Sequence, residues 1–332
     1  MRKFLWISTL CLGLSGLGLE VDLLEVDLAV APGQVYTFSF IARNETAVPE
    51  TFSIYVGDWD RDETGENRFY LPGTLPRSLS AWLSVAPASF TLGPGEAREV
   101  RGTLHVPTGT ATGTHWGIVF VHGEPRPVEH GGTTVMVARR IGVKIYATVG
   151  TGERTAEVLS LEPRGLNPLW LRLEFVNTAT VNLREVKVEV EVYDQFGNLV
   201  AKAGVDPFPC LPGAARWVVV PTDFRPVPGA YHILAKVDIG GDALLAGQVS
   251  LRVRPLELAP VADGKGVPRD LNGDGFYEDV NGDGVFDDSD VTTFVAVFGH
   301  PIIQGNWWAF DFNNDGVVDW DDVFELQRML DR

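Results

Sequence analysis

The sequence predicts a mainly β protein that consists of two β-sandwiches followed by a small α-helical domain. Between residues 20 and 254, short runs of β-branched and aromatic residues alternate with Gly, Pro, Asn and Asp, as is typical of strands and turns. After residue 269 the chain changes to acidic stretches, which are followed by apolar residues at helical spacing. At 332 residues, the chain is long enough for two or three domains that each bury a core.

Two segments show most clearly the alternation of half-buried strands. VYTFSFIARN (residues 35–44) alternates aromatic with small or polar side chains, and VKVEVEVYD (residues 186–194) alternates Val with Lys or Glu. About seven such runs occur in each half of the β region, which matches the strand number of a sandwich.

Gly-rich and Pro-rich stretches separate these parts. VGTGERT follows a long predicted strand over residues 133–149, so we place the boundary between the sandwiches at Gly150 to Thr155. PLELAPVADGKGVPR, residues 255–269, lacks periodicity and is rich in Pro and Gly, which indicates a linker.

The N-terminus has the pattern of a secretory signal peptide. Arg2 and Lys3 form a basic start, an apolar run follows, and small residues mark the cleavage region. The run is shorter than the roughly 20 apolar residues that span a bilayer, which argues against an uncleaved anchor, and nothing downstream resembles a membrane span. We therefore expect a secreted or cell-envelope protein with a signal peptide (residues 1–19), a first sandwich (20–150), a second sandwich (151–254), a linker (255–269) and a C-terminal domain (270–332).

Composition narrows the possible functions. Of the two cysteines, Cys11 lies in the predicted signal, so Cys210 has no intramolecular disulfide partner after cleavage. The net charge is −17, and residues 262–332 contribute −12 of it, with 16 Asp plus Glu against 4 Lys plus Arg. This balance argues against nucleic-acid binding, because phosphate recognition requires basic surface.

A twelve-residue acidic segment repeats in the C-terminal domain. DVNGDGVFDDSD (residues 279–290) recurs 32 positions later (311 minus 279) as DFNNDGVVDWDD (residues 311–322). Calcium loops of the EF-hand type take oxygen ligands at positions 1, 3, 5, 9 and 12 and a carbonyl at 7, with glycine at 6. Both segments fill these positions and predict two Ca²⁺ sites. The predicted ligands are Asp279, Asn281, Asp283, Asp287, Asp290 and the Val285 carbonyl, with Gly284 at the turn, and Asp311, Asn313, Asp315, Asp319, Asp322 and the Val317 carbonyl, with Gly316 at the turn.

Short amphipathic helices are predicted after the two loops. Their apolar stripes are Val291, Phe294, Val295 and Phe298 after the first loop, and Val323, Leu326 and Leu330 after the second. Since two short helices bury little surface, bound metal is expected to supply part of the stability. Trp307 and Trp308, between the helices, fit a small core or a partner-facing patch, and we favour the core.

A third acidic run, DLNGDGFYED, precedes the first loop and contains Asp270, Asn272, Asp274 and Glu278. We hypothesise an additional cation site built from Asp270, Asn272 and Asp274, with Asp279 as a further candidate. The alternative is a solvated entry loop. A measured stoichiometry of two ions would contradict the additional site.

Two calcium loop and helix units without an entering helix, placed after a linker, resemble a type I dockerin domain. The resemblance covers residues 270–332 and rests on ten side-chain positions and both loop glycines. It implies docking into a cohesin-like partner, typically in extracellular polysaccharide-degrading complexes. In that family, loop positions 10 and 11 help to select the cohesin, and here they are Asp288 with Ser289 and Trp320 with Asp321.

The order of segments in the β region resembles two further families. PGQVYTFSFIARN, SAWLSVAPASFTLGPGEAREV, VPTGTATGTHWGIVFV and ARRIGVKIYATVG follow one another as in the first domain of periplasmic pilus-assembly chaperones. They look still more like the paired domains of WxL-interacting surface proteins. The resemblance covers residues 21–254 and implies two immunoglobulin-like sandwiches. For chaperones it also implies basic anchors for a client carboxylate. Arg140 is the candidate on the last strand, with Arg139 or Lys144 as alternatives and a solvated strand face as the other interpretation.

The sequence contains no recognisable catalytic motif. It lacks a Gly-x-Ser-x-Gly elbow, a His-Glu-x-x-His motif, a phosphate loop and a paired-cysteine zinc site. The acidic loop DWDRDETGE, residues 58–66, fits a solvated hairpin tip better than the paired carboxylates of a glycosidase. We therefore expect a protein that is not an enzyme.

These patterns lead to one principal hypothesis and two alternatives. The principal hypothesis is a secreted, calcium-binding adhesion or assembly protein whose dockerin-like tail docks to a cohesin-like or cell-surface protein, while the sandwiches bind surface proteins or glycans. The first alternative is a periplasmic chaperone-like protein that donates an edge strand to a pilin-like subunit. The second is an accessory component of an extracellular polysaccharide-degrading complex.

Overall fold

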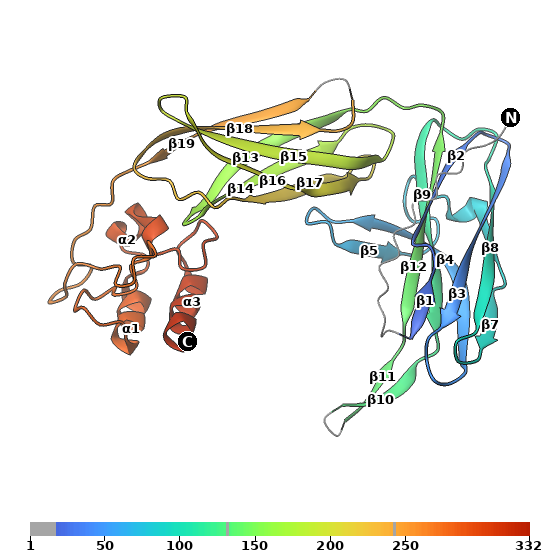
Figure 1. Ribbon diagram of the computed structural model, residues 1–332, viewed down its shortest axis with the longest axis horizontal. Coiled ribbons are helices and arrows are strands. Elements are labelled where there is room, and N and C mark those ends of the chain that lie inside the picture. The colour runs from blue at the N-terminus through green and yellow to red at the C-terminus, as the bar shows by residue number, and fades with distance from the viewer. Residues whose placement is uncertain (1–17, 131–132, 242–243) are drawn as a thin grey trace. The chain divides into compact units, whose positions relative to one another are not determined.

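The computed structural model describes residues 18–130, 133–241 and 244–332 (Figure 1). The predicted signal peptide therefore lies outside the described residues, apart from Gly18 and Leu19. Contacts divide the chain into two compact units. One comprises the chain up to Thr155 with residues 177–183 and 210–214, and the other comprises residues 156–176, 184–209 and 215–332. No helix within the described residues is long and apolar enough to cross a membrane.

The first sandwich consists of two sheets. The four-stranded sheet has the order β1 (Leu19–Val21), β3 (Val35–Asn44), β8 (Ala97–His105) and β6 (Leu83–Ala86). The second sheet has the order β2 (Glu25–Val30), β12 (Arg140–Val149), β9 (Gly113–Gly123), β4 (Glu50–Arg61) and β5 (Asn67–Tyr70). β7 (Ser89–Leu92) also pairs with β4. A 3₁₀ turn at Ser80–Trp82 precedes β6 in the chain.

This strand order is that of an immunoglobulin-like sandwich, as predicted. One sheet holds the first, second, fifth and fourth principal strands, and the other holds the third, sixth and seventh. The first strand divides between the sheets, since β1 pairs antiparallel with β3 whereas β2 pairs parallel with β12. The sheets enclose a core to which β3 contributes Phe40 and Ala42, while its alternate residues are exposed, so the alternation read from residues 35–44 is confirmed.

The long strand predicted over residues 133–149 is wrong. The chain instead forms β11 (Thr133–Val137), which turns back to pair with β10 (Arg126–His130), and then β12, which pairs with β9. The break falls at residues 138–139, where the Arg139 carbonyl accepts a hydrogen bond from Gly123 N–H. Figure 1 shows the β10–β11 hairpin projecting beyond the end of this sandwich.

The second sandwich has a three-stranded and a four-stranded sheet. The first is ordered β13 (Ala156–Leu166), β14 (Leu169–Asn177) and β17 (Ala215–Pro221), and the second β16 (Leu199–Cys210), β15 (Leu183–Asp194), β18 (Gly229–Asp238) and β19 (Leu245–Val253). The inward residues of β14 and β15 are almost all apolar, because each strand has one face in the core. The Val and charged alternation read from residues 186–194 corresponds to β15.

The tail contains α1 (Asp288–Val297), α2 (Pro301–Gly305), a 3₁₀ turn (Trp307–Ala309) and α3 (Trp320–Leu330). Helices α1 and α3 pack against each other (Figure 1). Their core is aromatic and aliphatic and includes Phe294, Phe310 and Leu326. Trp307 and Trp308 are partly buried against this core, which confirms the interpretation favoured from the sequence.

Candidate metal sites and partner surface

The first predicted calcium loop is organised around the carboxylate of Asp279. Its Oδ1 accepts a hydrogen bond from Asp283 N–H (3.0 Å), and its Oδ2 accepts one from Gly284 N–H (2.8 Å). Gly284 has a φ of +91°, which glycine adopts without the steric penalty of a Cβ. Asn281 Oδ1 also accepts from Asp283 N–H (2.8 Å). The order of acid, amide, acid and glycine therefore determines how this loop folds.

The loop is closed by Asp290 in the first turn of α1. This carboxylate is fully buried, with Oδ1 accepting from Asn281 N–H (3.0 Å) and Oδ2 accepting from Asp287 N–H (3.0 Å). Asp287 in turn caps the helix and forms a capping box with Asp290. The last metal ligand predicted from the spacing is thus held in place by the helix that follows the loop.

The second loop repeats these contacts at the equivalent positions. The equivalents are Asp311 with Asp315 (2.9 Å) and Gly316 (2.8 Å), and Asp322 with Asn313 (3.2 Å) and Asp319 (2.8 Å). Helix α3 has the matching capping box. Two different sequences therefore encode one loop structure.

The first and last carboxylates of both loops are buried and therefore partly desolvated. Burial, together with nearby carboxylates, raises the pKa of Asp311 to about 7 and that of Asp322 to about 6, and burial also raises the pKa of Asp290. By contrast, hydrogen bonds from Ser289 lower the pKa of the exposed Asp287. Carboxylate, amide and carbonyl oxygens are the donors that Ca²⁺ prefers, so the residues present fit that ion.

The third acidic run also forms a compact loop. The carboxylates of Asp270, Asp274 and Glu278 each place an oxygen within 4.8 Å of the others. Asn272 belongs to the same loop, where its Oδ1 accepts from Asp274 N–H (2.8 Å). The clustered third carboxylate is Glu278, whereas both carboxylate oxygens of Asp279 accept main-chain hydrogen bonds within the first loop. Burial and the charges of Asp270 and Asp274 raise the pKa of Glu278.

Comparison with protein families assigns the tail. Residues 277–331 match the family described as the dockerin type I domain. Residues 277–331 form a dockerin type I domain. Comparison with curated protein sequences found no significant match.

Several solved structures of fimbrial chaperones show a distant likeness to the chain. The class 5 fimbriae chaperone CfaA has 14% identity and a TM-score of 0.39, with 69% of this chain and 98% of that chain covered. The CsuC–CsuE chaperone and tip-subunit complex of Acinetobacter baumannii has 10% identity and a TM-score of 0.37, with coverage of 69% and 97%. The E. coli chaperone DraB has 14% identity and a TM-score of 0.35, with coverage of 71% and 96%. The immunoglobulin-like fold of the first sandwich is shown by its strand order.

The predicted partner-selecting positions differ in chemistry between the two helices, being polar in α1 and partly aromatic in α3. In α1, Asp288 is exposed, and the partly buried Ser289 accepts a hydrogen bond from Asn281 Nδ2 (2.6 Å). In α3, Trp320 is 52% exposed beside the exposed Asp321, and Phe324, one turn later, is 58% exposed. Trp320 also contacts the ring of Phe298, with ring centroids 5.2 Å apart. Phe324 was not predicted as part of a partner surface, because the loop positions alone do not show which helical residues are exposed.

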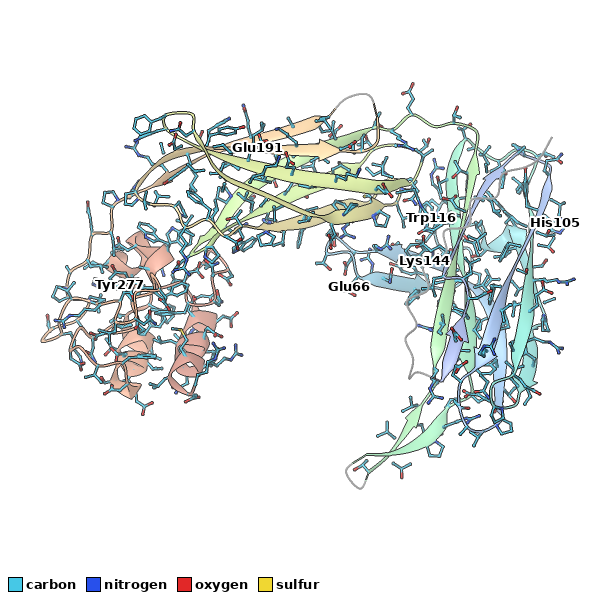
Figure 2. All side chains as sticks on the ribbon, in the orientation of Figure 1. Glu66, His105, Trp116, Lys144, Glu191 and Tyr277 are labelled. Atoms are coloured by element: carbon cyan, nitrogen blue, oxygen red, sulfur yellow. The ribbon has the colours of Figure 1, made fainter. Side chains whose placement is uncertain are left out.

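The basic candidates of the first sandwich contact its own side chains. The Arg140 guanidinium lies 4.5 Å from the Phe120 ring centroid. The ammonium of Lys144, which is labelled in Figure 2, lies 4.3 Å from the Trp59 ring centroid. Arg139 forms an ion pair with the buried carboxylate of Glu50 (3.5 Å). Arg140 is exposed and stays a predicted partner contact.

Within the second unit, the second predicted calcium loop contacts the turn between β13 and β14. Asn314, at loop position 4, accepts a hydrogen bond from Asn167 N–H at its Oδ1 (3.2 Å) and donates one from Nδ2 to the Pro168 carbonyl (3.0 Å). The Trp170 indole N–H donates to the Asn314 carbonyl. Asn314 has a φ of +56°, a conformation that Asn tolerates better than most residues.

Proposed function

We propose that this protein is a secreted or envelope-associated, non-enzymatic adaptor that docks through its dockerin domain to a cohesin-like partner in a calcium-dependent manner. The two immunoglobulin-like sandwiches present surfaces for a surface protein or a glycan. The dockerin match supports cohesin docking, and the acidic loops support calcium as the ion that orders the domain.

The observation that carries the proposal is the pair of preorganised loops. In each, the first carboxylate is held by two main-chain N–H groups, and the last carboxylate joins the loop to its helix. Bound calcium would neutralise the negative charge of these clustered carboxylates. The chain itself fixes the ligand positions, and the same loops set the start of α1 and α3.

The exposed face of α3 supports a partner surface next to the second loop. Trp320 and Phe324 lie one helical turn apart and are largely exposed. They therefore differ from the other aromatic residues of the domain, several of which are buried in its core. Exposed aromatic side chains commonly anchor protein interfaces. Because Trp320 directly follows the capping residue Asp319, an ordered loop fixes where this face begins.

The acidic segment at residues 58–66 supports a structural role. Asp58 is fully buried and accepts hydrogen bonds from Leu75 N–H (2.9 Å) and the Ser78 hydroxyl (2.6 Å). Asp62 accepts hydrogen bonds from the Thr64 hydroxyl and from three main-chain N–H groups in the turn between β4 and β5, and these hydrogen bonds lower its pKa. These carboxylates organise a hairpin, which is consistent with the proposed non-enzymatic role.

The test is affinity capture with the full chain as bait. In calcium the bait should retain a type I cohesin module or a cohesin-like protein from the native envelope and secreted fractions, and a chelator should release it. The double variant Asp279→Ala and Asp311→Ala should lose capture, while circular dichroism shows that the β-sandwiches remain folded. Capture by the double variant at the unmodified level would refute the proposal.

The edge of the first sandwich favours a second candidate, a chaperone-like donor of an edge strand. β12 pairs with β9 over residues 140–149 but with β2 only over residues 144–149. Residues 140–143 therefore retain one edge without a strand partner in the described part of the chain. A pilin-like subunit that is captured equally in calcium and in chelator, and that is lost on Ile141→Pro, would support this candidate over cohesin docking.

A further inference from the structure

A nine-residue acidic loop lies immediately before the dockerin calcium loops. Residues 270–278 are closed by two hydrogen bonds between Arg269 and Asp279, from Arg269 N–H to the Asp279 carbonyl (3.0 Å) and from Asp279 N–H to the Arg269 carbonyl (3.2 Å). The dockerin match begins at residue 277, so the Asp270, Asn272 and Asp274 part of this loop lies outside it. These acids therefore need an explanation separate from the two dockerin loops.

The main chain of this loop repeats the contacts of the two dockerin loops. Asp270 Oδ2 accepts from Gly275 N–H (2.9 Å), as Asp279 accepts from Gly284 and Asp311 from Gly316, each at 2.8 Å. Gly275 has a φ of +94°, close to the +91° and +94° of the other two glycines. This similarity shows the same turn but does not by itself indicate a ligand.

Glu278 provides the observation that points to a ligand. Its side chain is only 2% exposed, Oε1 accepts from Leu271 N–H (3.2 Å), and Oε2 has no hydrogen-bond partner among the described residues. A buried carboxylate oxygen without a donor is costly unless a cation compensates it. Glu278, Asp270 and Asp274 place carboxylate oxygens within 4.8 Å of one another, and none of the three forms an ion pair among the described residues. The nearby Arg225 donates to the Asp274 main-chain carbonyl (2.7 Å).

We propose that Asp270, Asn272, Asp274 and Glu278 bind a third calcium ion. Glu278, at position 9, is the last ligand of its loop, as Asp290 and Asp322 are at position 12 of theirs. Like them, it uses one carboxylate oxygen to accept a main-chain N–H from the start of its loop. Glutamate is one methylene longer than aspartate, which suits a shorter loop. Three carboxylates and an amide oxygen are hard donors, and the irregular set suits Ca²⁺ better than Mg²⁺, which demands near-octahedral geometry.

The third site shares a residue with the first. The main chain of Asp279 closes the nine-residue loop, and the same residue contributes the position 1 carboxylate of the next loop. Ordering of one loop therefore restricts the other, and calcium should bind the two with positive coupling. Calcium binding at this third site does not require docking to a cohesin.

Native mass spectrometry of the full chain, stripped of metal and titrated with calcium alone, tests the proposal. The unmodified chain should bind three ions. Glu278→Gln keeps the side-chain volume but removes the charge, and it should bind two. Glu257→Gln, the same substitution in the linker, should still bind three. Two ions on the unmodified chain, or three on Glu278→Gln, would overturn the proposal.

A second variant tests the site independently, in case Glu278→Gln misfolds. Asp270→Asn removes a different carboxylate of the third site, and it should also lose one ion while keeping two. Retention of two ions by either variant shows that the dockerin loops remain folded. A chain that binds three ions but captures no cohesin would leave the third site supported and count against the proposed function alone.

Discussion

The carboxylate of Asp290 joins the first predicted calcium loop to the helix that follows it. It is fully buried, accepts main-chain N–H groups from Asn281 and Asp287, and stands at position 12 of the loop. Asp288, in the same helical turn, is exposed, and its carbonyl accepts the Thr292 hydroxyl. Both acidic residues lie in α1, but Asp290 is buried whereas Asp288 is exposed to solvent.

We predict that Asp290→Ala removes one calcium ion and Asp288→Ala removes none. Isothermal titration calorimetry of the full chain should show one fewer ion bound for Asp290→Ala. The gain in unfolding free energy on adding calcium should fall by about 2.7 kcal/mol when free calcium is roughly 100 times the dissociation constant. If Asp290→Ala binds as many ions as the unmodified chain, Asp290 is not a ligand.

Spacing alone predicts which residues of the two twelve-residue loops would face an ion, because a loop of the EF-hand type fixes these positions. It could not predict the role of Glu278. The third loop has nine residues, so counting to position 12 leads to Asn281, which belongs to the next loop. The neighbour of Glu278, Tyr277 (Figure 2), donates its N–H to the Ala309 carbonyl (2.9 Å), a contact with a distant part of the chain that spacing does not show.

Helices α1 and α3 follow equivalent loops but differ in their exposed faces. Position 10 and the residue one turn later are Asp288 and Thr292 in α1, whereas they are Trp320 and Phe324 in α3. Exposed aromatic side chains provide a large apolar area that becomes buried when a partner binds, and this burial favours binding. We therefore expect the partner to contact α3 more than α1.

The corresponding prediction is that Phe324→Ala weakens cohesin binding with little effect on folding. Loss of an interface anchor commonly costs about 2 kcal/mol or more, which raises the dissociation constant roughly 30-fold. Phe324 is 58% exposed, so its removal leaves the core intact. Surface plasmon resonance in calcium measures the change.

Phe196→Ala is the matched control for this measurement. Phe196 is an aromatic residue with 79% exposure, located between β15 and β16 of the second sandwich. Its substitution should leave the dissociation constant unchanged. Equal affinities for Phe324→Ala and Phe196→Ala would exclude the exposed face of α3 as the docking surface.

Periodicity predicted some elements better than others. β3 and β15 follow directly from their alternation, because each has one face in a core. In α1, the buried side holds Phe294 and Val297, whereas Val295 is 40% exposed, so the predicted stripe was wrong at Val295. The short helix α2 was not predicted. Its signals were His300, which caps it, and Pro301 at its first position.

The dockerin domain and most of the second sandwich belong to one compact unit. Asn314 connects them, since its side chain bonds the Asn167 N–H and the Pro168 carbonyl while its own carbonyl accepts from Trp170. Asn314 stands between two predicted ligands, Asn313 and Asp315. An ion that orders the second loop therefore also orders the residue that contacts the β13–β14 turn.

We predict that Asn314→Gly uncouples this turn from calcium. Glycine tolerates the positive φ, so the loop should still bind its ion, but both side-chain hydrogen bonds are lost. Two hydrogen bonds contribute about 1–3 kcal/mol, so the Asn167 amide should exchange its hydrogen roughly 5-fold to 150-fold faster in calcium. Trp170→Phe should change exchange in the same direction, whereas amides between β18 and β19 serve as an internal control and should be unaffected. If hydrogen exchange at Asn167 is the same in Asn314→Gly and the unmodified chain, and if a chelator does not change it either, calcium binding in the dockerin domain does not order the second sandwich.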